Sequence, residues 1–344
     1  MKTQYANAVT QYENGTSLGG RIIKEGGLVV FPTETVYGLG ANGLNSEAVL
    51  KIFAAKGRPA DNPLILHIAK KSELKPLWSH VPDNARILAD TFWPGPLTMI
   101  FNRSSIVPDE VTAGLDTVAV RMPLNKTARA LINAAGVPIA APSANLSGKP
   151  SPTTAEHVRQ DMDGRVDLII DGGPCKYGLE STVVSLIGRP TILRPGAVTK
   201  EMLEAMIGPV DVAHAVLSPL REGETAASPG MKYRHYAPDA EVVVAEGRER
   251  DIAAKICREY DAREAAGEDC IIFATKQTQP FYRGRNCVII GDRTEPATLC
   301  ASLFYSLREY GDRADVIFAE ALPNDDMGLA YMNRLLRSAG FNII

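Results

Sequence analysis

Short apolar runs rich in β-branched residues alternate with segments of helical periodicity, and no other feature of the sequence constrains the fold as strongly. The alternation occupies two stretches, residues 21–208 and 239–344. Strands that alternate with helices are typical of α/β architectures, in which helices cover the faces of a sheet. Because 344 residues exceed the size of an average domain, we expect two α/β domains, the second smaller than the first.

Turn residues and caps between the runs give the expected elements. In the first stretch, strands are expected at 28–31, 64–68, 97–101, 118–120, 168–170 and 182–186, and helices at 46–56 and 127–135. In the second stretch, strands are expected at 241–245, 270–274, 287–291 and 316–319, helices at 249–266 and 296–310, and a last helix from about residue 325. Ser46 is the expected N-cap of the first of these helices.

The pattern weakens between Pro209 and Pro238. This segment ends in SPGMKYRHYAP, where two prolines and a glycine oppose regular structure. We therefore expect a first domain at 1–208, an interdomain linker at 209–238 and a second domain at 239–344.

Charge and cysteine usage exclude several classes of protein. The formal net charge is -3 and no long run of Lys or Arg occurs, which argues against general avidity for nucleic acid or anionic membranes. The five cysteines are scattered and lack the spacing of zinc or thiol redox motifs. No apolar leader or run of about 18 apolar residues indicates secretion or a membrane span. We expect reduced thiols and a cytoplasmic location.

The first candidate site segment is PTETVYGLG, residues 32–40, which follows an apolar strand. Strand ends of this kind often line pockets. The hydroxyls of Thr33, Thr35 and Tyr37 can exchange hydrogen bonds with an amino-acid ligand. A strand followed by a tight turn explains these residues equally well.

A second segment combines two cations with a glycine in KGRPADNP, residues 56–63. Arg58 can bind phosphate oxygens through its planar fork, while Lys56 supplies a point charge, which suits a triphosphate. For Lys56 alone, complementing the dipole at a helix C-terminus is the simpler interpretation.

Two further residues lie in apolar strands. His67, in LILHIA, is consistent with a structural histidine or with a ligand for a carboxylate or hydroxyl. Arg121 ends the run TVAVR, where an unpaired guanidinium would be costly to bury. Its partner can be a substrate carboxylate or an acidic side chain from elsewhere in the fold.

Small and hydroxyl-bearing residues complete the candidate segments. AAPSANLSG, residues 140–148, lets a nucleotide approach the backbone closely, although turn and capping chemistry explains its polar residues as well. ESTVV, residues 180–184, and Arg194 can complete a phosphate pocket, or they can serve local capping and ion pairing.

Taken in order, PTETVYGLG, KGRPADNPLILHI, TVAVRMP, APSANLSG, ESTVV and LRPGAV resemble the YrdC-like domain of threonylcarbamoyl-AMP synthases. SPGMKYRHYAP is similar to the interdomain linker of the family's long form, and GLAYMNRLLRSA is similar to its closing helix. The resemblance covers residues 18–340. It implies a YrdC-like twisted α/β sheet domain with a basic concave cleft, followed by a smaller three-layer, Rossmann-like α/β domain.

The resemblance also implies a reaction. Bicarbonate captures the amine of L-threonine, and the carbamate oxygen attacks the α-phosphate of ATP to give threonylcarbamoyl-AMP and pyrophosphate, for threonylcarbamoyladenosine modification of tRNA. No protein nucleophile is needed, which agrees with segments that supply cations and hydroxyls and contain no nucleophile-base pair.

Site residues follow from the resemblance at matching positions. For L-threonine they are Thr33, Thr35, Tyr37, His67, Arg121, Ala141 and Ser181. For ATP they are Lys56, Arg58, Asn62, Thr117, Ser143, Asn145, Ser151, Thr182, Arg194 and Tyr236. Lys56 and Arg58 are the expected catalytic residues, because cations placed where phosphate charge develops stabilise the transition state. If Tyr236 contacts the nucleotide, the linker before it is an expected lid.

The resemblance also implies a cofactor and partners. Mg²⁺ is expected to arrive with ATP, since the motifs contain no pair of aspartates for a dedicated site, and no metal ligand is assigned. The expected partners are small-molecule substrates and downstream threonylcarbamoyl-transfer machinery, with no stable nucleic-acid or membrane binding. Two alternatives remain: an RNA-binding module with a YrdC-like fold, and a carbamoyltransferase acting on a protein. The lack of paired CxxC motifs disfavours the second.

Overall fold

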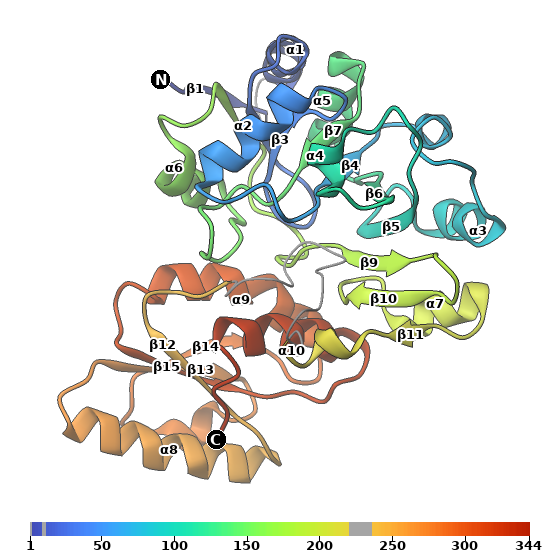
Figure 1. Cartoon of the computed structure of the whole chain (residues 1–344). Helices are drawn as coiled ribbons and strands as arrows, with labels where there is room; N and C mark the ends of the chain where they lie inside the picture. The colour runs from blue at the N-terminus through green and yellow to red at the C-terminus, as the bar shows by residue number, and fades with distance from the viewer. Residues whose placement is uncertain (1, 9–11, 220–235) are drawn as a thin grey trace. The chain divides into compact units, whose positions relative to one another are not determined.

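The computed structural model describes residues 2–8, 12–219 and 236–344 (Figure 1). The chain divides into two compact units, Met1–Ser147 with Ser151–Lys232 and Gly148–Pro150 with Tyr233–Ile344. Both units have α/β architecture, which confirms the predicted fold class. Most of the expected linker, residues 220–235, lies outside the described residues.

Eleven strands form one mixed sheet in the described part of the first unit, in the order β1-β8-β2-β3-β7-β4-β6-β5-β9-β10-β11. The strands are β1 (Gln4–Asn7), β2 (Val29–Phe31), β3 (Gly38–Asn42), β4 (Ile65–His67), β5 (Leu97–Asn102), β6 (Thr117–Arg121), β7 (Ile139–Ala141), β8 (Leu168–Asp171), β9 (Thr182–Ser185), β10 (Thr191–Arg194) and β11 (Asp211–Val212). The expected domain boundary at 208 comes just before β11, which pairs in parallel with β10.

Helices accompany this sheet on both faces. They are α1 (Tyr12–Lys24), α2 (Ser46–Lys56), α3 (Asp83–Phe92), α4 (Asp109–Thr112), α5 (Lys126–Ala135), α6 (Ala155–Met162) and α7 (Lys200–Ile207), with 3₁₀ turns η1 (Lys71–Leu74) and η2 (His214–Val216). The sheet alternates its side chains, so Val29 and Phe31 pack with Leu131 of α5, whereas Val30 packs with Ile52 of α2. The sheet therefore has a hydrophobic core on each face.

The start of α2 differs from the prediction by one residue. Asn45, and not Ser46, is the N-cap, because its side-chain oxygen accepts the backbone N–H of Ala48 at 3.0 Å. The Ser46 hydroxyl instead donates to Glu110 at 2.7 Å. The helix ends at Gly57, whose φ of 66° is a left-handed conformation that favours glycine. Lys56 therefore lies in the last turn, just before the chain changes direction.

The second unit is a three-layer sandwich around a parallel sheet (Figure 1). Its strands β12 (Glu241–Ala245), β13 (Cys270–Thr275), β14 (Cys287–Gly291) and β15 (Val316–Glu320) are arranged in the order β12-β15-β13-β14. Helix α8 (Glu249–Ala265) and the 3₁₀ turn η3 (Gln279–Tyr282) cover one face, and α9 (Pro296–Tyr310) and α10 (Asp326–Ser338) cover the other.

Residue alternation explains the two faces of this smaller sheet. Ile272 and Phe318 face α8 and pack in one cluster with Ile256. The neighbouring Phe273 points to the opposite face, where its ring lies 5.9 Å from that of Tyr310 in α9. Strands buried on both faces read as continuous apolar runs, which is why this sheet was recognisable in the sequence.

Candidate active site

Strand β2 leads into a turn that is held by the Thr33 side chain. The Thr33 hydroxyl accepts the backbone N–H groups of Thr35 and Val36 at 3.1 and 3.2 Å, and donates to the Val36 carbonyl at 2.5 Å. The two threonine hydroxyls lie 2.8 Å apart. Both threonines are buried. The turn therefore orients Thr35 toward the next group of the site, the guanidinium of Arg121.

Arg121 ends β6 and is buried, with its charge held by a carboxylate. Its Nη2 donates to Glu34 Oε1 at 2.6 Å, its Nη1 donates to Thr35 Oγ1 at 2.9 Å, and its Nε lies 3.4 Å from the Gly95 carbonyl. The partner that the sequence left open is thus an acid from the same segment as the two threonines. A guanidinium anchored on one edge is fixed in orientation for any further anionic ligand.

Glu34 is the residue that sequence reasoning did not identify as the partner of Arg121. Its Oε2 accepts the backbone N–H of Asn125 at 3.1 Å. Burial alone would raise the pKa of Glu34, but the charge and hydrogen bond of Arg121 outweigh burial and keep the pKa below its usual value. The signal that could have identified it is a lone acid between two threonines at a strand end, beside an arginine that needs a partner.

His67 lies beside Arg121, because the two residues are paired in register on strands β4 and β6. Its Nδ1 is 3.1 Å from the Ile65 carbonyl, and its ring meets the Phe31 ring edge-on at 6.0 Å. Burial, followed by the nearby positive charge of Arg121, lowers the pKa of His67 to about 3. The imidazole is therefore neutral at neutral pH, and it suits a neutral hydrogen-bonding group.

Other residues expected at the threonine end are engaged in local structure. The Tyr37 hydroxyl donates to the Gly173 carbonyl at 2.7 Å and accepts the Gly172 N–H at 3.2 Å. Burial raises the pKa of Tyr37 far above its usual value, so the phenol remains protonated. Ala141 ends β7 and pairs with Ile65 of β4.

Ser181 and Arg194 form a second buried polar group beside β5. The Ser181 hydroxyl lies 2.8 Å from that of Thr98 and accepts from Arg194 Nη2 at 3.3 Å, while Arg194 Nε donates to the Ser181 carbonyl at 3.1 Å. The adjacent Thr182 hydroxyl donates to the Val198 carbonyl at 2.6 Å and is fully buried. The structure therefore brings together Ser181, which was expected at the threonine end, and Arg194, which was expected at the nucleotide.

Lys56, Ser143 and Asn145 also come together. The buried ammonium of Lys56 donates to the Ser143 carbonyl at 2.5 Å, to the Asn145 carbonyl at 2.6 Å and to Asn145 Oδ1 at 3.4 Å. The Ser143 hydroxyl donates to the same Oδ1 at 2.6 Å. The lysine is thus directed at the loop after β7, and it fixes the shape of the loop whose small residues can admit a ligand.

Asn62 carries the clearest sign of a missing partner. Its side chain is completely buried, yet neither its amide nitrogen nor its amide oxygen has a hydrogen-bond partner among the described residues. A buried amide without partners costs about 1–3 kcal/mol, so such groups usually face a ligand or water. In the same loop, the guanidinium carbon of Arg58 lies 5.2 Å from the centre of the Phe53 ring.

The remaining expected nucleotide residues are spread over several elements. The Ser151 hydroxyl donates to Glu180 Oε1 at 2.6 Å, and both residues are buried. Thr117 begins β6 and is half-buried. Tyr236 belongs to the second unit, where its ring centre lies 4.8 Å from that of Phe304, and its φ is 64°. Its expected contact with nucleotide stays a prediction.

Backbone pairing connects these groups around the central strands. Ala144 N–H donates to the Tyr37 carbonyl at 2.9 Å, and Gly38 forms an isolated bridge with Ser143. The PTETVYG and APSAN segments are therefore direct neighbours. In the same way Thr182 N–H donates to the Pro96 carbonyl at 3.0 Å, which places β9 beside β5. The resulting site holds buried cations, hydroxyls and a partnerless amide.

Two negative findings apply to residues 2–8, 12–219 and 236–344. None of the helices there combines the length and apolar character needed to cross a membrane. The same residues contain no group of three or more His, Cys, Asp or Glu side chains arranged to hold a metal ion.

Two family models match the chain. One, described as telomere recombination, matches residues 21–196, and the other, described as the C-terminal domain of threonylcarbamoyl-AMP synthase, matches residues 198–340. Together they extend over both α/β units and leave unmatched only residues 1–20, residue 197 and residues 341–344.

Named relatives match over nearly the full length. A Bacillus subtilis protein named threonylcarbamoyl-AMP synthase is 47% identical over 326 residues, which are 94% of this chain and 92% of the relative. A Pyrococcus abyssi protein of the same name is 47% identical over 325 residues, with 94% and 93% covered. The solved structure of P. abyssi Sua5 complexed with L-threonine matches with a TM-score of 0.93 at 44% identity, covering 100% of this chain and 99% of that one.

Proposed function

The chain belongs to the threonylcarbamoyl-AMP synthase family, and we propose how its own side chains carry out the synthesis of threonylcarbamoyl-AMP. The threonine amine attacks the carbon of bicarbonate and water is lost, which leaves a carbamate. A carbamate oxygen then attacks the α-phosphorus of ATP, the bond to the β-phosphate bridging oxygen breaks, and pyrophosphate leaves. The product supplies threonylcarbamoyladenosine synthesis on tRNA.

Threonine is held at the ends of β2, β4 and β6. Arg121, fixed by Glu34, presents its remaining donors to an anionic group of the substrate, and Thr35 lies within hydrogen-bond distance of the same guanidinium. The neutral His67 interacts with the substrate hydroxyl, since a neutral imidazole adds no charge to the site. Ser181, Thr33, Tyr37 and the Ala141 backbone shape this end of the pocket.

The nucleotide is held by the loops after α2 and β7, and Asn62 is the observation that carries this assignment. Its buried amide has two donors and an acceptor to offer, as the base or ribose of ATP requires. Lys56 and Arg58 lie at the C-terminus of α2 on either side of Gly57 and stabilise phosphate charge. The other expected ATP residues are Thr117, Ser143, Asn145, Ser151, Thr182, Arg194 and Tyr236.

Magnesium reaches the site with ATP in this proposal. The nearby carboxylates already have protein partners, since Glu34 pairs with Arg121 and Glu180 accepts from Ser151. They fit water-mediated contact better than direct ligation, so no residue is assigned as a magnesium ligand. When bound, the ion neutralises charge on the phosphate oxygens, while the cations of the chain orient the triphosphate.

The wider biological setting is also a proposal. We place the catalytic residues in the first domain, with residues 209–238 as the linker and the second domain in an accessory role. The enzyme works in the cytoplasm and passes its adenylate to threonylcarbamoyl-transfer machinery. It has no stable complex with nucleic acid, in keeping with a formal net charge of -3.

Pyrophosphate release tests the proposed reaction. The protein is incubated with ATP, Mg²⁺ and bicarbonate together with each amino acid in turn, and pyrophosphate is measured. We expect release that requires both L-threonine and bicarbonate, with serine as the nearest competitor. Release that is independent of threonine or bicarbonate would contradict the proposal. Steeply salt-dependent RNA binding without any pyrophosphate would favour an RNA-binding module instead.

A further inference from the structure

The second unit contains a pocket of about 1020 Å³ at the carboxyl edge of its parallel sheet. This volume is at the upper end of the range for small-molecule sites. Three loops line it: the turn from β12 into α8, the loop between β14 and α9, and the loop from β15 into α10. The lining residues are Glu246, Gly247, Arg248, Glu249, Arg250, Asp251, Arg293, Thr294, Ala321, Leu322, Pro323 and Asn324.

The topology of the sheet explains why a pocket opens there. Strands β12 and β15 are parallel neighbours, but the chain leaves β12 toward α8 on one face and leaves β15 toward α10 on the opposite face. The two loops diverge and leave a crevice between them. In open parallel sheets, ligands bind at such a switch point, outside the carboxyl ends of the strands.

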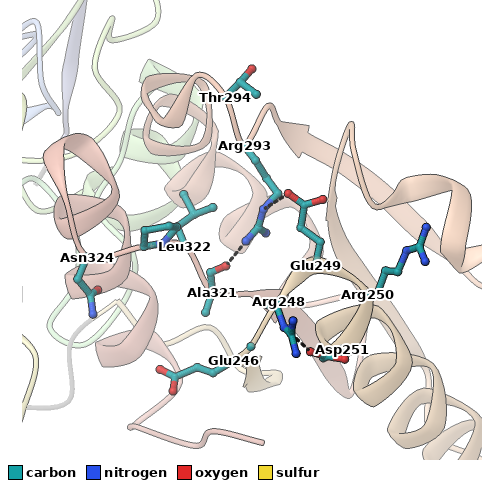
Figure 2. A pocket seen from close by; sticks show the side chains of 12 residues that line it. Glu246, Arg248, Glu249, Arg250, Asp251, Arg293, Thr294, Ala321, Leu322 and Asn324 are labelled. Carbon is teal, nitrogen blue, oxygen red and sulfur yellow. Dashed lines mark hydrogen bonds and ion pairs between the residues drawn. The ribbon is translucent and has the colours of Figure 1, made fainter.

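Arg293 lies at the centre of the pocket and is anchored from below (Figure 2). Its Nη1 donates to the buried Glu320 at 2.9 Å and its Nη2 donates to the Ala321 carbonyl at 2.8 Å. Glu320 also accepts from Thr275 at 3.1 Å, from Tyr282 at 2.9 Å and from Thr278. The Arg293 side chain is only 10% exposed, so its orientation is set before any ligand arrives.

The remaining edge of the Arg293 guanidinium faces the Glu249 carboxylate, which an anionic ligand can displace. Arg293 Nε lies 3.6 Å from Glu249 Oε1, beyond hydrogen-bond distance, and the Glu249 side chain is 53% exposed. An exposed and loosely paired carboxylate contributes little to stability, so a stronger anion can replace it. Figure 2 shows Glu249 positioned over Arg293, with the guanidinium of Arg293 between it and Ala321.

Further groups around Arg293 suit the other parts of a nucleotide. Arg250 also lies in the first turn of α8, but its side chain points away from Arg293 in Figure 2, so the phosphate contact is assigned to Arg293. Gly247, at φ 138°, admits a close approach to the backbone. On the opposite wall, Leu322 and Pro323 offer an apolar surface, and the Asn324 amide can hydrogen-bond a base edge.

We propose that this pocket binds a nucleoside monophosphate, with its phosphate on Arg293 and its base on the wall formed by Leu322 and Pro323. Binding displaces Glu249 from Arg293. The Glu246 carboxylate, at the end of β12, accepts the ribose hydroxyls, a role that acids at the ends of parallel strands can fill. All residues that line the pocket belong to the second unit, and the proposed binding goes beyond the synthase reaction.

A site-resolved titration tests this proposal on the full-length protein. AMP is added to ¹⁵N-labelled protein, and binding is followed at the amide signals of Gly247 and Asn324, which report this pocket rather than the catalytic site. We expect saturable shifts. Because Glu249 competes with the phosphate, Glu249→Gln is expected to bind AMP at least three-fold more tightly than wild type, whereas Arg293→Lys, which lacks the planar fork, binds at least three-fold more weakly.

A matched variant and two further ligands make the test decisive. Arg258→Ala removes an exposed arginine from the same helix, outside the pocket lining, and should leave AMP affinity unchanged. Unchanged affinity in both Glu249→Gln and Arg293→Lys would overturn the site. Adenosine binding as tightly as AMP would overturn the phosphate contact, and inorganic phosphate binding as tightly would overturn the nucleoside. Threonine-dependent pyrophosphate release should stay within two-fold of wild type in all three variants, which separates this site from the catalytic one.

Discussion

Each unit of the chain holds one arginine against a buried glutamate, and the two pairs differ in how completely the protein itself satisfies them. In the first unit, Arg121 and Glu34 are 2.6 Å apart with side chains 4% and 5% exposed. In the second, Arg293 and Glu320 are 2.9 Å apart, and Glu320 receives three additional hydroxyl donors. The second pair is embedded in a network that is complete without a ligand.

The first pair lies among polar groups that are only partly used. Arg121 shares its surroundings with the Thr33 and Thr35 hydroxyls and the neutral His67, and in the same unit the Asn62 amide has no partner in the described structure. Buried polar groups are costly unless they are paired. The difference supports the proposal that substrates complete the first cluster, whereas the Glu320 network holds one arginine in place.

The largest effect is expected from Arg121→Ala. It removes the donor fork to substrate and leaves Glu34 buried without its counter-ion, so kcat/KM for threonine should fall by about 10³ and the free energy of unfolding by about 3 kcal/mol. Pyrophosphate release and urea unfolding measure the two effects. Arg121→Lys keeps the charge and should recover stability more than activity, because Lys lacks the planar fork.

An exposed arginine of the same unit provides the control. Arg86→Ala removes a surface pair with Asp83, whose side chains are 64% and 87% exposed, and should leave both activity and stability unchanged. If Arg121→Lys retains full kcat/KM, the guanidinium is structural, and the contrast between the two units disappears.

Breaking the second pair should lower stability to a similar extent but leave activity intact. Arg293→Met leaves Glu320 without its cation, and we expect the free energy of unfolding to fall by about 3 kcal/mol, with less loss if the three hydroxyl donors stabilise the carboxylate. At a temperature where the variant is folded, kcat for pyrophosphate release should stay within two-fold of wild type. A loss of kcat as large as that of Arg121→Ala would show that Arg293 takes part in the reaction.

The sequence predicted the strands and helices better than it predicted these pairs. Apolar runs buried on both sides of a sheet are visible as local patterns, and so were found. Strands β1, β3, β7 and β11 were not predicted: β3 and β7 consist largely of glycine and alanine, and the two residues of β11 are too few for a pattern. Arg121 was recognised as needing a partner, but the identity of Glu34 depends on the folding of segments 87 residues apart.

Other parts of the site depended on similarly long-range contacts. Lys56 was predicted to belong to the site, but its acceptors lie in a loop 87 and 89 residues away and could not be identified from the sequence. Arg293 and Glu320 stand in no motif, so nothing local marks them. Periodicity reports which face of an element is buried, but it does not report which polar side chains meet at the strand ends.

A smaller effect is expected from His67, which lies beside Arg121. At pH 5 its burial should lower the free energy of unfolding by about 2 kcal/mol relative to neutral pH. Its folded pKa of about 3 is below the ordinary value of 6.5, so the unfolded chain binds the proton more readily. Stability is therefore complete above pH 6.5 and falls by about 1.4 kcal/mol per pH unit as the pH drops from 6.5 toward 3.

Chemical denaturation of wild type and His67→Gln at pH 7 and pH 5 measures this contribution. The loss of unfolding free energy between the two pH values should be about 2 kcal/mol smaller in the variant. The depressed pKa of Glu34 acts in the same direction, but only below its ordinary value of 4.5, outside the range measured. Equal losses in the two proteins would mean that His67 is not shielded from protons in the native state.

Asn62 provides the smallest effect and the sharpest test of the contrast between the units. If its amide waits for the nucleotide, Asn62→Leu removes an unsatisfied buried group and should leave stability unchanged or about 1 kcal/mol higher. The same change should raise KM for ATP about ten-fold, because one or two hydrogen bonds to the nucleotide are lost. Denaturation and initial rates of pyrophosphate release at varied ATP measure both quantities on one protein. If Asn62 has a structural role, Asn62→Leu should instead lower stability and leave KM for ATP unchanged. The polar groups of the first cluster would then be satisfied by the protein alone, as those of the Glu320 network are.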